Sequence, residues 1–186
     1  MPSAIADLRS LAPHRPLTVN EARRVAELQA ARLLEMQGVT EPPVPEQLIE
    51  YLPRVRVEFV PGPVSGAVQW LGSRWLITIN SGEAWVRQRW SLAHEFKHAL
   101  DAPLMATLYP TTRRESAHQR QERAAHHFAA ALLLPKAWVK SAFYDQGIRN
   151  ELALARHFQV SVAALRIRLE ELGMTPRGTR VERGHR

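Results

Sequence analysis

The sequence predicts an α+β fold, in which a small three-stranded sheet, antiparallel or mixed, packs on helices. Between residues 55 and 80, apolar and polar residues alternate as they do in half-buried strands. Before residue 38 and after residue 82, apolar residues recur every three or four positions, which is the spacing of amphipathic helices. The chain has 186 residues, of which 45% are hydrophobic, so it is long enough to bury a core.

The first half of the chain is expected to supply one long helix and the three strands. Thr18 and Glu21 form a capping-box pattern ahead of a helix that ends at Gly38. Three prolines then lead into a short helix at residues 46–51. The expected strands are residues 55–60, 66–71 and 74–80. Gly72-Ser73 predicts a tight hairpin turn between the last two of them.

The second half of the chain is expected to be helical. Helices over residues 85–101 and 115–134 are separated by a polar loop at residues 102–115. Two short helices over residues 149–172, joined around Gln159–Ser161, have the apolar spacing of a helix-turn-helix. We therefore divide the chain into a core at residues 1–146, a helix-turn-helix-like segment at 147–173 and a disordered tail at 174–186.

Composition excludes several classes of protein. The chain contains no cysteine, which excludes disulfide scaffolds, thiolate metal sites and a cysteine nucleophile, so any metal site must use His, Asp and Glu. The net charge is +7, but no dense basic stripe marks a dedicated nucleic-acid domain. No apolar run approaches the roughly 20 residues of a membrane span, and residues 1–16 lack the layout of a signal peptide. We expect a cytoplasmic protein with no membrane partner.

One segment carries a recognisable chemistry. His94-Glu95-Phe96-Lys97-His98 places two histidines one helical turn apart, on the same face of the expected helix. Two imidazoles at that spacing can bind one Zn²⁺ ion. The glutamate, one step further round the helix, can reach a water molecule at the metal and act as a general base.

A catalytic zinc site also needs a third protein ligand. Asp101 follows His98 on the same side of the helix, but its short side chain makes tetrahedral ligation awkward, and support of a histidine or a surface position suits it better. Glu122 is the better candidate, because it lies on the second long helix. That helix is otherwise rich in alanine and packs closely, and His126 follows Glu122 by one turn on the same face.

At this point the sequence resembles the ImmA/IrrE metallo-endopeptidases, over about residues 20–172. The resemblance rests on the order and spacing of three motifs. They are a strand that ends in Asn80, the segment from Arg89 to His98 around the two histidines, and Glu122-x-x-Ala125-x-x-Phe128-Ala129 followed by Leu132-Leu133-Leu134-Pro135. The resemblance implies that residues 1–146 form a zincin-like metallopeptidase core.

The resemblance also implies roles for individual residues. By it, His94, His98 and Glu122 would bind Zn²⁺, the only cofactor expected, and Glu95 would be the catalytic base. The sequence departs from the family where Phe96-Lys97 replaces Leu-Gly, where His126 replaces Asn and where Leu134 replaces Met. We expect Lys97 to be solvated. His126, Asp101 and Tyr109 are the residues that could hydrogen-bond to a metal ligand or donate a hydrogen bond to the transition state.

The expected function is a zinc-dependent endopeptidase that cleaves a specific protein, such as a helix-turn-helix transcriptional repressor. Either strand 66–71 or strand 74–80 could hold the substrate as an added strand. The alternative is a non-enzymatic DNA- or protein-binding regulator, including a toxin–antitoxin partner, that retains the metal site. The intact Glu95 favours the enzyme, since a purely structural site has no use for a base. DNA binding is not favoured, because Glu170 and Glu171 offset the charges of Arg166 and Arg168.

Overall fold

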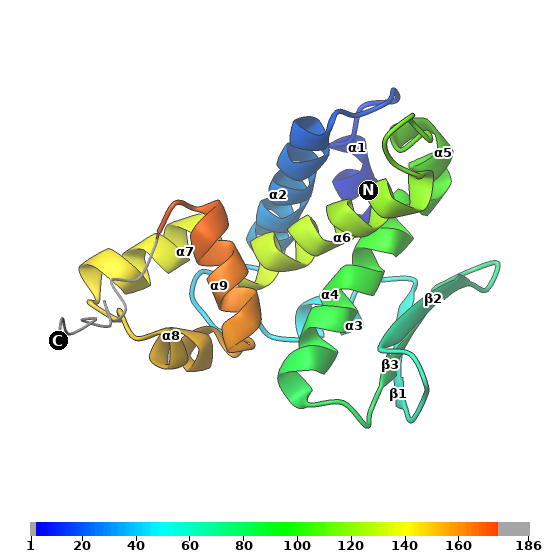
Figure 1. Cartoon of the computed structure of the whole chain (residues 1–186). Coiled ribbons are helices and arrows are strands. Elements are labelled where there is room, and N and C mark those ends of the chain that lie inside the picture. Colours follow the sequence, from blue (N-terminus) through cyan, green and yellow to red (C-terminus); the bar gives the residue numbers. More distant parts are fainter. Residues whose placement is uncertain (1–2, 175–186) are drawn as a thin grey trace, which may run out of the picture.

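A computed structural model describes residues 3–174 of the chain (Figure 1). Its sheet has three strands in the order β1-β3-β2. β1 (Val55–Val60) runs parallel to β3 (Trp75–Asn80), and β2 (Gly66–Trp70) runs antiparallel to β3. The expected α+β class and mixed sheet are therefore confirmed. The expected tail at residues 174–186, apart from Met174, lies outside the described residues.

The central strand shows why the three strands form one sheet. Trp75, Ile77 and Ile79 alternate with less buried residues along β3, so one face of the strand is apolar throughout and lies in the core. β2 and β3 are joined by the tight turn expected at Gly72-Ser73. Gly72 has a φ of +79°, and the N–H of Leu71 donates to the carbonyl of Arg74 at 2.9 Å.

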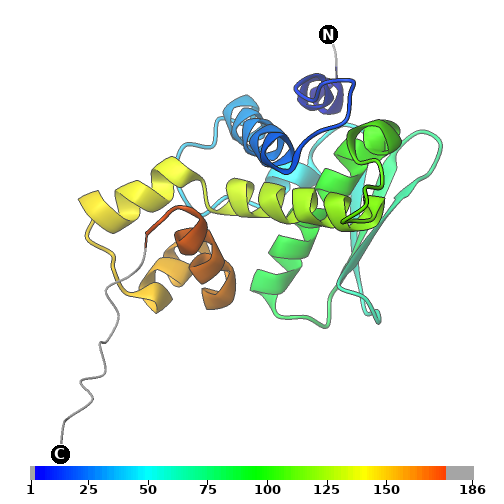
Figure 2. The same cartoon turned by 45° about the horizontal axis from the view of Figure 1, so that its top comes forward.

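One of the three long helices packs on this sheet, and the helices pack on one another. The capping box of Thr18 and Glu21 begins α2 (Val19–Met36), as expected. α4 (Trp85–Asp101) lies beside the sheet, and α6 (Ala117–Leu133) packs between α2 and α4 (Figure 2). α6 begins two residues later than expected, because Ser116 and Gln119 form a second capping box. Buried alanines along α6 let it approach both neighbours closely.

Several short helices were not expected from the sequence. α1 (Ala4–Ser10) begins at the N-cap Ser3 and buries Ile5 and Leu8, but it is too short to show a clear periodicity. The expected loop at residues 102–115 contains a 3₁₀ turn, η1 (Ala102–Leu104), and α5 (Met105–Leu108). The short helix expected at residues 46–51 is present as α3 (Gln47–Glu50). The remaining short elements are α7 (Lys136–Lys140) and the π-helical turn η2 (Ser141–Asp145).

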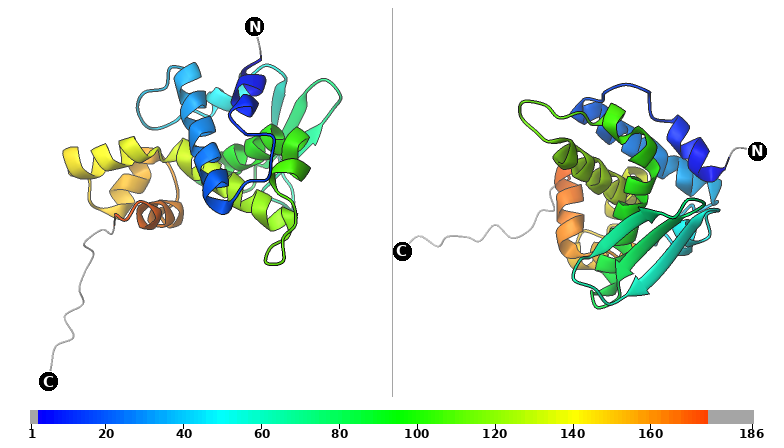
Figure 3. Two further views of the ribbon diagram at one scale, coloured as in Figure 1. Left: turned by 90° about the horizontal axis from the view of Figure 1, so that it is seen from above. Right: turned by 90° about the vertical axis from the view of Figure 1, so that its right-hand side faces the viewer.

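The C-terminal helices form the pair that the sequence indicates. α8 (Glu151–Phe158) and α9 (Val162–Glu171) are joined at Gln159, which adopts a left-handed conformation with φ of +55°. The pair lies at the far end of the molecule from the sheet (Figure 3). Buried residues of both helices, including Phe158 and Leu165, belong to the same hydrophobic cluster as α4 and α6. The boundary between residues 146 and 147 stays a prediction.

None of the helices in the described part of the chain combines the length and apolar character needed to cross a bilayer.

Candidate metal centre

Helix α4 brings two histidines together. His94 and His98 lie one turn apart on the same face, because they are separated by four residues. Their Nε2 atoms are 3.1 Å apart, and their ring centroids are 4.8 Å apart. Both side chains are largely buried, with 11% and 16% of their surface exposed. The two imidazoles therefore point their outer nitrogens at the same place.

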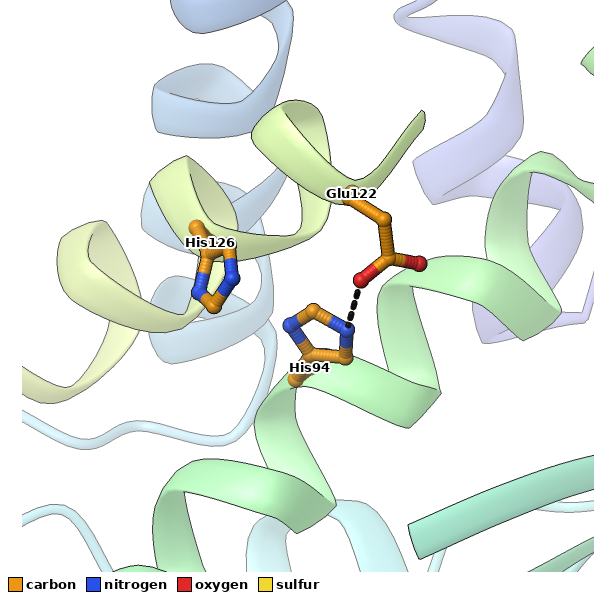
Figure 4. A group of neighbouring side chains, drawn as sticks. All are labelled: His94, Glu122 and His126. Carbon is orange, nitrogen blue, oxygen red and sulfur yellow. Dashed lines mark ion pairs between the residues drawn. The ribbon is translucent and has the colours of Figure 1, made fainter. Parts of the chain in front are cut away.

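Helix α6 supplies a carboxylate at that place. Glu122 Oε2 lies 3.3 Å from His94 Nε2, and Glu122 Oε1 lies 3.1 Å from His98 Nε2. Figure 4 shows the carboxylate of Glu122 facing the ring of His94 across the gap between the two helices. The packing of Phe96 against Phe128, with ring centroids 6.0 Å apart, holds the helices in this register. The structure thus brings together the three residues expected to bind the metal.

The geometry of these three residues fits a tetrahedral metal ion. Bonds of about 2.0–2.1 Å at tetrahedral angles separate neighbouring donor atoms by about 3.3 Å. The observed separations of 3.1, 3.1 and 3.3 Å are close to this value. Burial, together with His98 and His126, lowers the pKa of His94 to about 4, and burial also lowers the pKa of His98. Both imidazoles are therefore neutral at neutral pH, which is the form that binds metals.

A second donor set overlaps the first. His126 lies one turn after Glu122 on α6, and its ring meets the ring of His94 edge-on with centroids 4.7 Å apart (Figure 4). Donor atoms of His94, Glu122 and His126 all lie within 4.8 Å of one another. In the set with His98 the donor atoms lie 3.1–3.3 Å apart, close to the spacing around a tetrahedral ion. The supporting role expected for His126 stays a prediction. The ring Nδ1 of His94 is buried and has no hydrogen-bond partner among the described residues.

Glu95 points towards the sheet. A Cβ atom added to Gly66, the first residue of β2, would lie 2.8 Å from Cγ of Glu95 and 3.2 Å from its Oε1. Only a glycine at this position leaves room for the glutamate side chain. Burial, and after it the nearby Glu122, raises the pKa of Glu95 to about 7. A carboxylate with this pKa exchanges protons readily at neutral pH.

The structure corrects the expectations for Lys97, Asp101 and Tyr109. Lys97 is 1% exposed and not solvated: its Nζ donates to Asp101 Oδ1 at 2.6 Å and to Gln29 Oε1 of α2 at 2.7 Å. The hydroxyl of Tyr109, itself 1% exposed, donates to Asp101 Oδ2 at 2.7 Å. Asp101 therefore anchors a buried network between α4, α2 and α5, and its two oxygens are occupied by Lys97 and Tyr109. The hydroxyl of Tyr109 is therefore not available to a substrate, and burial raises the pKa of this phenol well above the usual range.

Two residues near the site were missed from the sequence. His118 lies one turn before Glu122, with its Nδ1 3.8 Å from Glu122 Oε1, and is 78% exposed. Its spacing of four residues from Glu122 was a signal that could have found it. Gly66 could not have been found in this way, because its closeness to Glu95 depends on how β2 lies over α4.

Comparison with known proteins identifies the family of the chain. No curated protein gives a significant match. A solved structure of a Mycobacterium tuberculosis transcriptional regulator shares the fold over 98% of this chain, with a TM-score of 0.61 and 15% sequence identity. The chain spans 55% of the length of that regulator. A model of the IrrE N-terminal-like domain, Peptidase_M78, matches residues 54–170, which include the sheet, α4 and α6. The chain therefore belongs to the Peptidase_M78 family of IrrE N-terminal-like domains, as its motifs suggested.

Proposed function

We propose that the chain is a zinc-dependent endopeptidase. The observation that carries this proposal is the convergence of two imidazole nitrogens and one carboxylate, 3.1–3.3 Å apart, beside the partly buried Glu95. Three protein ligands leave a fourth position open for water or substrate, which is the arrangement of catalytic zinc sites. Nitrogen and oxygen donors without a thiolate, in tetrahedral array, suit Zn²⁺.

The chemistry divides between the metal and the chain. When bound, Zn²⁺ supplies a Lewis acid that polarises a peptide carbonyl and acidifies water. Glu95 takes a proton from the attacking water, whose oxygen bonds to the carbonyl carbon. The C–N bond then breaks, and Glu95 returns the proton to the departing amine nitrogen. Its pKa of about 7 suits both transfers, because such a group accepts and releases protons with equal ease near neutral pH.

We assign the binding of the substrate backbone to strand β2. It forms one edge of the sheet, whereas β3 lies between two partners, so only the first of the two strands considered from the sequence remains available. Just before β2, the carbonyl of Ser65 accepts from the N–H of Asn80 in β3, and just after β2, the N–H of Leu71 donates to the carbonyl of Arg74. Because bonding alternates along an antiparallel pair, Gly66 and Val68 direct their N–H and C=O groups away from β3. A peptide paired with these groups would pass directly over Glu95.

His126 is the side chain that we assign to the developing oxyanion. It stands beside His94 and is exposed to solvent, so substrate can reach it. Tyr109, another candidate from the sequence, already donates its hydroxyl proton to Asp101. A donor placed where negative charge develops stabilises the transition state more than the ground state.

The substrate proposed for this site is a folded regulatory protein, such as a repressor with a helix-turn-helix. The family resemblance suggests this class of substrate. Membership of the Peptidase_M78 family supports the peptidase part of the proposal. The likeness to a transcriptional regulator is compatible with a role in gene regulation.

The alternative is a DNA-binding regulator that retains the metal site. The helix pair α8–α9 favours it, since the second helix of such a pair can enter the major groove. Two contacts oppose it. Arg168 is 2% exposed and donates to the carbonyl of Leu134, and Arg166 pairs with Glu151 at 2.6 Å. Arg168 is buried and cannot reach a phosphate. Arg166 is 61% exposed but would have to exchange Glu151 for the phosphate, so the peptidase is the stronger proposal.

The proposal is tested by separating metal binding from hydrolysis. The parent chain and Glu95→Gln should each bind about one Zn²⁺ ion, measured by mass spectrometry of the purified protein. Only the parent should cleave a co-expressed helix-turn-helix repressor, with fragments identified by mass. A parent without zinc under zinc-replete conditions, or a Glu95→Gln variant that still cleaves, contradicts the proposal. Binding of duplex DNA at low salt, without cleavage, favours the alternative.

A further inference from the structure

A cavity opens beside the candidate metal centre. Its volume is about 650 Å³, within the range of ligand-binding pockets. Glu122 and His126 form part of its wall, so the cavity is continuous with the place where a peptide bond would be cleaved. Most of the remaining exposed surface is apolar, although Arg87 and Arg123 also line the cavity. The apolar residues come from three helices: Val86 and Trp90 of α4, Ala130 of α6, and Ala163, Ala164 and Ile167 of α9.

Helix α9 is fixed in this position by buried polar contacts. Arg168 lies between α9 and α6, where it donates to the carbonyl of Leu134 at 3.1 Å and pairs with Glu171 at 3.1 Å. At the other end of the pair, Arg89 of α4 donates to the side chain of Gln159 at 2.7 Å. The turn between α8 and α9 is thus tied to the helix that carries the two histidines. The face of α9 that carries Ala163, Ala164 and Ile167 lines this cavity.

The wall suits an apolar side chain better than a basic one. Ile167 is 58% exposed although it lines a concave surface, which leaves a large apolar side chain without a protein partner there. The two carboxylates of the wall are already engaged, Glu171 by Arg168 and His127, and Glu122 by the two histidines. A basic substrate side chain would therefore be buried without a counter-charge, which is costly.

We propose that α9 forms the wall of a specificity pocket, which takes a large apolar side chain of the peptide substrate next to the scissile bond. The inference rests on the proposed function, because it assigns the substrate class of the same site. Ala163, Ala164 and Ile167 are the residues of α9 that determine the preference. The helix-turn-helix-like segment thereby serves substrate selection in the peptidase.

Peptide hydroxamates that differ in one side chain test the pocket without requiring turnover. The zinc-loaded full chain is titrated by calorimetry with probes that carry Gly, Leu, Phe or Lys at that side chain. The parent should bind the Leu and Phe probes at least about tenfold more tightly than the Gly probe, the discrimination typical of an apolar pocket. Ile167→Asp should remove most of this preference and raise the affinity for the Lys probe. Ala163→Trp, which fills the cavity from an exposed position, should reject the Phe probe.

Leu152→Asp is the matched control, because Leu152 is 50% exposed on α8 and does not line the cavity. It should keep the preference of the parent. Equal affinities of the parent for the Gly, Leu and Phe probes contradict the proposed pocket. The proposal is also contradicted if Ile167→Asp has the same ratios of probe affinities as the parent. Loss of duplex DNA binding in Ile167→Asp, with unchanged probe affinities, also overturns it, since α9 would then contact DNA. A chain that shows the expected preference but cleaves no protein supports the pocket and contradicts only the proposed function.

Discussion

Gly66→Ala is the change whose effect follows most directly from the structure. The added Cβ would lie 2.8 Å from Cγ of Glu95, whereas carbon atoms in ordinary contact are at least about 3.5 Å apart. The glutamate must therefore move by about 0.7 Å, because the other side of the contact is the backbone of β2. A misplacement of about 1 Å in a reacting group can lower the rate about 100-fold. We expect kcat to fall roughly 10- to 100-fold.

The same variant should leave the rest of the molecule intact. Glu95 is not among the three residues that meet at the candidate metal centre, so the zinc content should stay at that of the parent. Stability should change little, since alanine also restricts the unfolded chain. The assay combines kcat on the cleaved protein, zinc content and the thermal midpoint of unfolding. Gly62→Ala is the control, because a Cβ at Gly62 meets nothing within 4 Å. Parental kcat in Gly66→Ala would falsify the placement of Glu95 under β2, and loss of zinc would show a wider disturbance than the one argued.

Three further predictions concern the metal, the buried network and pH. His98→Ala should lower the affinity for Zn²⁺ by at least tenfold and His126→Ala should lower it less, because His98 belongs to the tighter donor set. Competition with a chelator measures both affinities, and the reverse order would mean that His126, and not His98, is the ligand. Asp101→Ala should lower the free energy of unfolding, measured in urea, by about 3–5 kcal/mol, because it leaves Lys97 buried without its counter-charge. A loss below about 1 kcal/mol would show that Lys97 finds another partner or reaches solvent. Hydrogen bonds from His127 and Arg168 lower the pKa of Glu171 from 4.5 to about 2, so its contribution to stability is complete above pH 4.5 and is lost as the pH falls towards 2. The difference in unfolding free energy between the parent and Glu171→Gln should shrink over that range, and a constant difference would contradict this pairing.

The fold could be predicted from the sequence where its signals are local. The capping box of Thr18, the alternation along β3 and the turn at Gly72-Ser73 each involve residues close in the chain, and all three are confirmed. The short helices at residues 4–10 and 102–108 were missed. Each spans only one or two turns, so their hydrophobic periodicity is too brief to detect, and tertiary packing supplies their stability.

The residues that could donate to a metal ion were predictable from the sequence, but the contacts that surround them were not. Two histidines four residues apart on a helix must share a face, which made His94 and His98 a pair before any packing was known. Lys97 was expected in solvent because its polar side chain gave no sign of a buried partner. Its partner Gln29 lies 68 residues away on another helix, and only the packing of α2 against α4 brings the two together.

The sequence by itself determined the α+β class, the long helices, and the two histidines and Glu95 of the motif, because these depend on residue types at short spacing. The tertiary structure alone decided the distances at which the expected Glu122 meets both histidines, that β2 is the edge strand over Glu95, and that α9 lines a cavity beside the site. These features join residues far apart in the chain. Their positions follow from which faces bury apolar surface against one another, and no local pattern contains that information.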